Sequence, residues 1–181
     1  MRSVLRRQFI KFGALALAAG VPTHWARAAN DKTERRLAFH STHTAENIDV
    51  VYRIGNDYIP ESLAQIDRVL RDHRNNEIYP MRIELLDLLH TLSMTLDVET
   101  AFHVISGYRS PATNAVLAAQ SEGVAKHSLH IEGKAIDIRL PGCELSDLRR
   151  AAIALKLGGV GDYPRLNFVH VDIGRVRHRR T

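Results

Sequence analysis

Two histidines and one aspartate, far apart along the chain, have the residue types of a metal site. His130 and Asp137 are separated by a short segment that contains Gly133, and His170 follows much later in the chain. Catalytic zinc takes three nitrogen or oxygen ligands from a protein and keeps a further position for water. The three residues are therefore a candidate zinc site, although each histidine taken alone is more often a hydrogen-bonded surface or core residue than a ligand.

Strand alternation would direct these side chains to one side of a sheet. In the segment 134–140, Asp137 lies between two isoleucines, so the isoleucines can face a core while the carboxylate faces a cleft. In the segment 167–173, His170 lies between two valines in the same way. If the two strands are neighbours, both side chains reach one ion, and a turn at the intervening glycine brings His130 to it from the preceding loop.

Four separated motifs, in the same order, resemble one peptidase family. They are Ser106-Gly107-Tyr108-Arg109-Ser110-Pro111, Ser128-x-His130-x-x-Gly133-x-Ala135-x-Asp137, Gly158-Gly159-Val160-Gly161 and Phe168-Val169-His170-Val171-Asp172-x-Gly174. With these motifs the sequence resembles the M15-type zinc peptidases of the D-Ala-D-Ala metallopeptidase and hedgehog superfamily. Within that superfamily it is most similar to the exported murein endopeptidase K group, over residues 35–178.

The resemblance implies a set of roles. One zinc ion per chain would be held by His130, Asp137 and His170. Arg109 would lie in the substrate cleft, where a guanidinium can pair with a stem-peptide carboxylate. The implied activity is hydrolysis of peptide crosslinks of peptidoglycan that involve diaminopimelate, both D-Ala-linked and directly diaminopimelate-linked.

The general base does not follow from the resemblance. Many M15 relatives place a histidine or glutamate two or three residues before the last ligand, where this chain has Phe168 and Asn167. Asp172 is expected on the same strand face as His170, and it is either the base or a residue that orients a ligand histidine. His127 is a second catalytic candidate, which would stabilise the oxyanion or move a proton.

Several polar residues near the motifs keep more than one interpretation. Tyr108 is a candidate for substrate binding, and Tyr163 is a similar candidate, but ordinary packing explains both tyrosines equally well. Glu132 and Asp162 are weaker alternatives for the base. Ser128 belongs to no Ser-His-Asp arrangement, so we expect it to make structural hydrogen bonds.

Residues 1–28 predict an export signal. A basic start is followed by an apolar run over residues 12–21 and by the small-residue site Ala26-Arg27-Ala28. The apolar run is too short to remain as a membrane anchor. The segment Leu5-Arg6-Arg7-Gln8-Phe9-Ile10-Lys11 resembles the twin-arginine export motif. We therefore expect cleavage after Ala28 and release into the periplasm.

The charge of the chain gives no support to nucleic-acid binding. The formal net charge is +5, but residues 1–28 hold five basic residues and no acid, so the remaining chain has 20 of each sign. A formally neutral domain has little general attraction for polyanions. The basic tail 175–180 is expected to be a solvated end, and the single cysteine, Cys143, excludes an internal disulfide.

The rest of the chain predicts one peptidase domain, residues 37–181, after a flexible segment at 29–36. Residue alternation predicts strands at 37–44, 47–54, 102–106, 134–140 and 167–173, with a further short strand after Gly158. Helices are predicted from Pro60 to Leu70, over 81–96, from Pro111 onward and over 145–157. This order favours the α+β class, with an antiparallel sheet flanked by helices as in the hedgehog and D-Ala-D-Ala peptidases.

Three functions are compatible with the sequence. The leading hypothesis is a periplasmic zinc endopeptidase that opens peptidoglycan crosslinks. A D-Ala-D-Ala carboxypeptidase would use the same metal site with a more closed pocket. A catalytically silent, zinc-containing wall-binding module would explain the missing upstream base. The sequence predicts no nucleic-acid partner and leaves the oligomeric state open.

Overall fold

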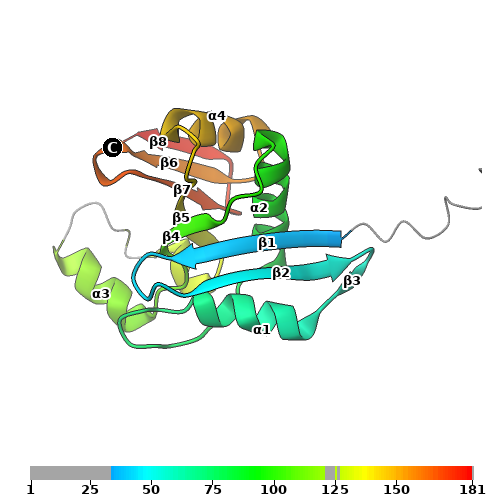
Figure 1. The fold of residues 1–181 in the computed structure, drawn as a ribbon. Helices are drawn as coiled ribbons and strands as arrows, with labels where there is room; N and C mark the ends of the chain where they lie inside the picture. Colours follow the sequence, from blue (N-terminus) through cyan, green and yellow to red (C-terminus); the bar gives the residue numbers. More distant parts are fainter. Residues whose placement is uncertain (1–33, 121–124, 126, 181) are drawn as a thin grey trace, which may run out of the picture. The chain divides into compact units, whose positions relative to one another are not determined.

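The computed structural model describes residues 34–120, 125 and 127–180, so the predicted export signal lies outside the described residues. In chain order the described elements are β1 (Glu34–Ser41), β2 (Asn47–Ile54), β3 (Asp57–Tyr58), α1 (Pro60–Val69), α2 (Ile83–Leu96), β4 (Phe102–Ser106), α3 (Pro111–Gln120), β5 (Ala135–Arg139), α4 (Leu145–Leu155), β6 (Gly159–Tyr163), β7 (Phe168–Asp172) and β8 (Arg177–Arg180). Across these residues, the strands form one sheet of eight in the order β3-β2-β1-β4-β5-β7-β6-β8 (Figure 1).

The predicted hairpin is present, but its first strand starts early. β1 and β2 pair antiparallel, and Glu34 lies opposite Ile54 at the open end of the hairpin. The prediction that 29–36 is flexible is therefore wrong for residues 34–36, because their backbone groups find hydrogen-bond partners in β2. The next helix begins at the predicted Pro60, whose missing N–H costs nothing in the first turn.

The α+β class is confirmed, while the sheet is mixed rather than wholly antiparallel. β1 pairs parallel with β4, and β6 pairs parallel with β8. The second pairing adds to the expectation of a solvated tail, because residues 175–179 are exposed but the tail forms a strand. Residues 177–180 form the edge strand β8, which lies along β6 (Figure 1). β8 gives the backbone of β6 a partner on its second side, and Arg177 forms an ion pair with the buried Asp172.

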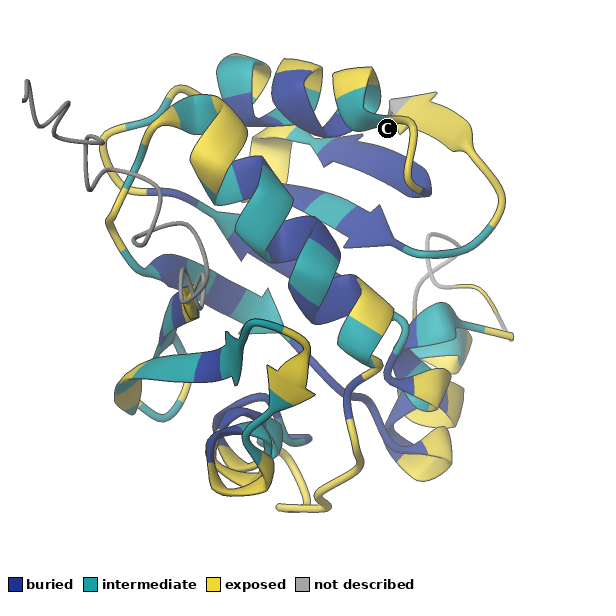
Figure 2. Cartoon of the chain, turned by 90° about the vertical axis from the view of Figure 1, so that its right-hand side faces the viewer, coloured by how far each residue is buried: buried dark blue, intermediate teal, exposed yellow. Residues whose placement is uncertain are grey.

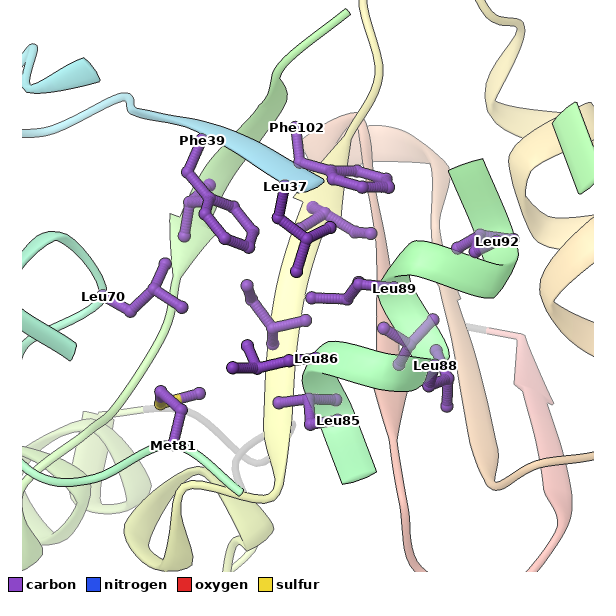
Figure 3. Packing of buried hydrophobic residues seen from close by; sticks show 14 of the residues in the cluster. Leu37, Phe39, Leu70, Met81, Leu85, Leu86, Leu88, Leu89, Leu92 and Phe102 are labelled. Atoms are coloured by element: carbon purple, nitrogen blue, oxygen red, sulfur yellow. The ribbon is translucent and has the colours of Figure 1, made fainter. Parts of the chain in front are cut away.

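The core lies between one face of the sheet and the helices α1, α2 and α4. Buried side chains concentrate on the central strands and on the inward faces of these helices (Figure 2). Figure 3 shows Leu89 of α2 turned toward Leu37 of β1, within the same core cluster as Phe102 of β4. Leu89 is fully buried there, and truncating such a side chain to alanine costs about 2–5 kcal/mol.

The same alternation leaves the polar residues of the central strands on the other face. Ile136 and Ile138 of β5 belong to the core cluster, as do Val169 and Val171 of β7. Asp137 lies between the two isoleucines, so its side chain points away from the helices, as predicted. Among the described residues, no helix is long and apolar enough to cross a membrane.

Candidate metal centre

Asp137 and His170 are directly paired across β5 and β7, and His130 joins them from the loop before β5. His130 Nε2 lies 3.2 Å from His170 Nδ1 and 3.3 Å from Asp137 Oδ1. His170 Nδ1 lies 2.8 Å from the same carboxylate oxygen. Ligands bound at 2.0–2.1 Å around a tetrahedral zinc ion are about 3.3 Å apart. The three residues predicted as ligands therefore meet with a spacing that suits one ion.

The loop that carries His130 is held by local structure. Leu129–Glu132 form a single turn of 3-10 helix, and the Ser128 side chain accepts a hydrogen bond from the His130 amide at its start. Gly133 ends the turn with a φ of 63°, in the left-handed region. A Cβ at this glycine would also collide with the Pro80 carbonyl. Ser128 is thus structural, as expected, and Gly133 supplies the predicted turn.

Each histidine has a partner for the nitrogen that faces away from the centre. His130 Nδ1 lies 2.7 Å from the Gly107 carbonyl oxygen, which only accepts, so this nitrogen carries the proton. His170 Nε2 lies 2.9 Å from Asp172 Oδ2 and donates to it in the same way. The protons on the outer nitrogens leave a lone pair on His130 Nε2 and another on His170 Nδ1.

Three electron-rich atoms thus converge, and a proton or a metal ion between them would relieve their mutual repulsion. Burial disfavours the charged carboxylate, but its interactions with His130 and His170 prevail and lower the pKa of Asp137. Burial also disfavours a charged His170, yet Asp137 and Asp172 raise its pKa to about 9. A divalent ion with nitrogen and oxygen ligands can take the place of a proton at such a centre.

Asp172 is fully enclosed and uses both carboxylate oxygens. One oxygen accepts from the Gly159 and Gly174 amides and from Arg177, at 3.2, 2.8 and 3.0 Å. The other accepts from His170 and, at 2.6 Å, from Arg177. Burial opposes ionisation, but these bonds lower the pKa of Asp172. A Cβ at Gly159 would collide with the ion pair, which explains a glycine at this position.

Arg109 approaches the centre from the chain segment after β4. Its Nη2 lies 3.6 Å from Asp137 Oδ2 and 3.3 Å from the Ser106 hydroxyl, and its Nη1 lies 3.4 Å from Asn114 Oδ1. The side chain is buried, which lowers its pKa. Its Nε has no hydrogen-bond partner among the residues that the structure describes. Arg109 thus contacts the carboxylate oxygen that is turned away from the histidines.

The centre opens into a cleft of about 290 Å³. Its described lining includes all three candidate ligands together with Arg109, His127, Tyr163, Arg177 and Arg179. The prediction that Arg109 faces a cleft is therefore consistent with its position. His127 is exposed at the same wall, where a side chain can exchange protons with a bound substrate.

Three candidate site residues predicted from the sequence, Tyr108, Asp162 and Glu132, do not line the cleft. Tyr108 is buried, stacks on Tyr79, donates a 2.7 Å hydrogen bond to Glu77 and is not part of the cleft lining. Its assignment to substrate binding is therefore replaced by a packing role. Asp162 is paired with Val169, so it lies on the helix side of the sheet and forms an ion pair with Arg149.

Glu132 does not reach the centre either. Its carboxylate forms an exposed ion pair with Lys134 on the loop surface. With Asp162 on the opposite face of the sheet, neither of the weaker alternatives for the base is suitably placed.

Sequence reasoning missed the contribution of the C-terminal strand. Arg177 and Arg179 line the cleft, although the basic tail suggested only a solvated end. The available signal was the alternation in Val176-Arg177-His178-Arg179, which places the two arginines on one face of a strand. Nothing in the sequence indicated that this strand would pair with β6.

Comparison with known proteins identifies the family. A sequence model described as peptidoglycan L,D-endopeptidase MepK matches residues 28–179. The chain belongs to this family. It is 41% identical over 174 residues to the peptidoglycan L,D-endopeptidase MepK of Escherichia coli K12, with 96% of each chain covered. It is 36% identical to the probable peptidoglycan L,D-endopeptidase MepK of Haemophilus influenzae, which covers 95% of this chain and 94% of that relative. No solved structure gives a significant match.

Proposed function

We propose that this chain is an exported zinc metallopeptidase that hydrolyses peptide crosslinks of peptidoglycan. The observation that carries the proposal is the convergence of His130 Nε2, Asp137 Oδ1 and His170 Nδ1 on one point at the wall of a cleft. The names of the relatives indicate the substrate, because both are peptidoglycan L,D-endopeptidases. Such a substrate is consistent with the periplasmic location predicted from the export signal.

Zinc held by these three atoms would supply a Lewis acid that activates water and polarises the carbonyl to be attacked. The chain's own residues fix the geometry in which this happens. The Gly107 carbonyl and Asp172 set the tautomers of His130 and His170. Arg109 holds the outer oxygen of Asp137 and adds positive charge at the cleft wall, where negative charge develops on the substrate carbonyl.

We assign Asp172 to positioning and His127 to proton transfer. Asp172 is fully buried and both its oxygens are already engaged, so it has no access to a water in the cleft. A carboxylate that binds the outer nitrogen of a ligand histidine increases the basicity of that ligand and fixes its orientation. His127 is exposed in the cleft, and its imidazole is a group that can accept and donate a proton.

The two alternatives receive less support. A carboxypeptidase that trims D-Ala needs a pocket closed around a chain end, whereas the relatives are endopeptidases by name. A silent wall-binding module would need no side chain for proton transfer, whereas His127 lies in the cleft beside the candidate ligands.

The direct test is digestion of purified peptidoglycan sacculi by the zinc-loaded protein without its export signal. Mass spectrometry of the released muropeptides identifies which bond is cut, and new free amines report hydrolysis. We expect loss of crosslinked species with wild type and none with His130→Ala. Release of D-Ala alone would indicate the carboxypeptidase. Binding to sacculi without any new amine would indicate the silent module.

A further inference from the structure

The strand β8 carries a guanidinium that lines the cleft and has no ionic partner among the described residues. Arg109 and Arg177 also line the cleft, but each is paired with an aspartate, Asp137 and Asp172 respectively. Arg179 forms no ion pair with any residue that the structure describes. Asp137 is the only acid among the described lining residues, so the described part of the cleft wall carries a net positive charge.

Sheet register fixes the position of Arg179 relative to the metal centre. Asp137 pairs with His170, His170 with Gly161, and Gly161 with Arg179. Directly paired residues of neighbouring strands project to the same face of a sheet. The four residues therefore form one row on the cleft side, across β5, β7, β6 and β8. Adjacent strands are about 4.8 Å apart, so the Cα atoms of His170 and Arg179 are separated by about 10 Å.

Gly161 makes room for the Tyr163 ring between His170 and Arg179. A Cβ at this glycine would lie 3.2 Å from His170 Cβ and 3.0 Å from the Tyr163 ring, so a larger residue would crowd both side chains. The cleft floor between the metal centre and Arg179 is thus formed by the Gly161 backbone and the Tyr163 ring. The residue that flanks a bond cut at the centre can lie on this floor, and its polar group would reach β8.

We propose that Arg179 binds a free carboxylate of the peptide substrate, within one residue of the bond that is hydrolysed. The proposal deepens the proposed function and rests on it. Arginine presents a planar donor pair that fits a carboxylate with two hydrogen bonds. The neighbouring arginines are held by their own aspartates, so they attract the anion at longer range without being able to pair with it fully.

Two carboxylates of a crosslinked stem peptide satisfy this chemistry. In a direct crosslink between two diaminopimelate residues, the carbon that bears the amide nitrogen also bears a free carboxylate. The second source is the carboxylate at the end of the stem peptide. The short span from the metal centre to Arg179 favours the first source, because that carboxylate is adjacent to the bond that is cut.

The test measures hydrolysis of three synthetic crosslinked peptides by the zinc-loaded protein. One has both carboxylates free, one is amidated beside the scissile nitrogen, and one is amidated at the chain end. The variants are Arg179→Gln, Arg179→Lys and, as a matched loss of one exposed arginine far from the cleft, Arg150→Gln. The readouts are KM and kcat separately, with circular dichroism to compare folding.

We expect Arg179→Gln to raise KM by about tenfold on the free peptide, with kcat little changed, because one charge-assisted pair is lost. Amidation beside the scissile nitrogen should cause the same loss in wild type, and no further loss in Arg179→Gln. Arg179→Lys should recover part of the affinity, and Arg150→Gln should behave as wild type.

If wild type cuts all three peptides and Arg179→Gln has the same KM as wild type, the assignment of Arg179 is wrong while the proposed function stands. The assignment is also wrong if Arg179→Gln lowers activity equally on free and amidated peptides. If chain-end amidation alone removes the effect of Arg179, the terminal carboxylate is the ligand and the adjacent one is excluded. Failure of the wild-type protein to cut any peptide would contradict the proposed function and this inference together.

Discussion

Among the described residues, three pairs of histidine rings lie close together, His40–His103, His43–His73 and His130–His170, and only the last pair has the features of a metal centre. His43 and His73 stack face to face, with ring centroids 3.8 Å apart and an interplanar angle of 9°. His130 and His170 are tilted by 53° and point a nitrogen each at a shared point beside Asp137. Residue type and proximity are therefore insufficient, because the ring nitrogens must converge.

The metal-centre pair and the stacked pair also differ in the groups around their ring nitrogens. In the metal centre, the Gly107 carbonyl and Asp172 take up the two outer N–H groups. Among the described residues the stacked pair shares no carboxylate, and burial together with the electrostatic effect of His43 and Arg74 lowers the pKa of His73 to about 4. One pair is thus arranged to attract a cation, whereas in the other the protonation of His73 is disfavoured.

The largest expected difference is between an alanine substitution in the metal-centre pair and one in the stacked pair. His130→Ala should remove bound zinc and reduce hydrolysis of sacculi to background, because only two ligands remain. His73→Ala should keep about one zinc per chain and wild-type hydrolysis. Elemental analysis and amine release measure both. If His130→Ala keeps both its zinc and its activity, the assignment of His130 as a metal ligand is wrong.

A smaller effect tests the partner of the outer nitrogen. Asp172→Asn should weaken zinc binding by about 10–100-fold, because loss of such a carboxylate lowers the basicity and order of a ligand histidine. Excess zinc should then restore much of the hydrolysis. Competition with a chelator gives the affinity. If Asp172→Asn binds zinc normally but has lost turnover, Asp172 is the general base and the positioning role is wrong.

The ion pair between Arg177 of β8 and Asp172 should contribute to the stability of the folded protein. Arg177→Gln leaves a buried carboxylate with fewer donors and should lower the free energy of unfolding by about 1–3 kcal/mol, less than for a fully buried pair because Arg177 is partly exposed. Arg36→Gln removes the exposed pair with Asp49, which has a similar distance of 2.7 Å, and should leave the urea midpoint unchanged. Equal midpoints for both variants would show that β8 does not support the centre.

The smallest effect concerns His73 of the stacked pair and the pH dependence of stability. The pKa of His73 is lowered in the folded state, so protonation favours the unfolded chain, in which the pKa is near its usual value of about 6.5. The stabilisation is present above about pH 6.5 and is lost as the pH falls from there toward 4. The melting temperature of wild type should therefore drop more between pH 7 and pH 5 than that of His73→Phe. The same drop in both proteins would contradict the assignment.

Much of the metal centre was accessible from the sequence because it depends on local alternation. Asp137 between two isoleucines and His170 between two valines predicted both the strands and the face, and the pairing of these residues confirms that logic. The helix at Pro60 was predicted to within one residue of its observed end, and the strand Phe102–Ser106 was predicted with its observed bounds.

The parts that were not predicted depend on long-range pairing. β8 consists of charged residues that have no apolar face, and only its hydrogen bonds with β6 make it a strand. The two interpretations of Asp172 could not be separated before its five contacts were known, since burial distinguishes a positioning carboxylate from a base. Tyr108 lies beside Arg109 in the sequence, but its hydroxyl is turned to Glu77 rather than to the cleft.

The central claim is that one metal ion is bound by three specific atoms. The most direct test is a crystal structure of the zinc-loaded protein with anomalous data collected on both sides of the zinc absorption edge. We predict one strong anomalous peak, coordinated by His130 Nε2, Asp137 Oδ1 and His170 Nδ1, with Asp172 still bonded to the far nitrogen of His170. A peak held by other residues, or no peak between these three side chains, would contradict the account.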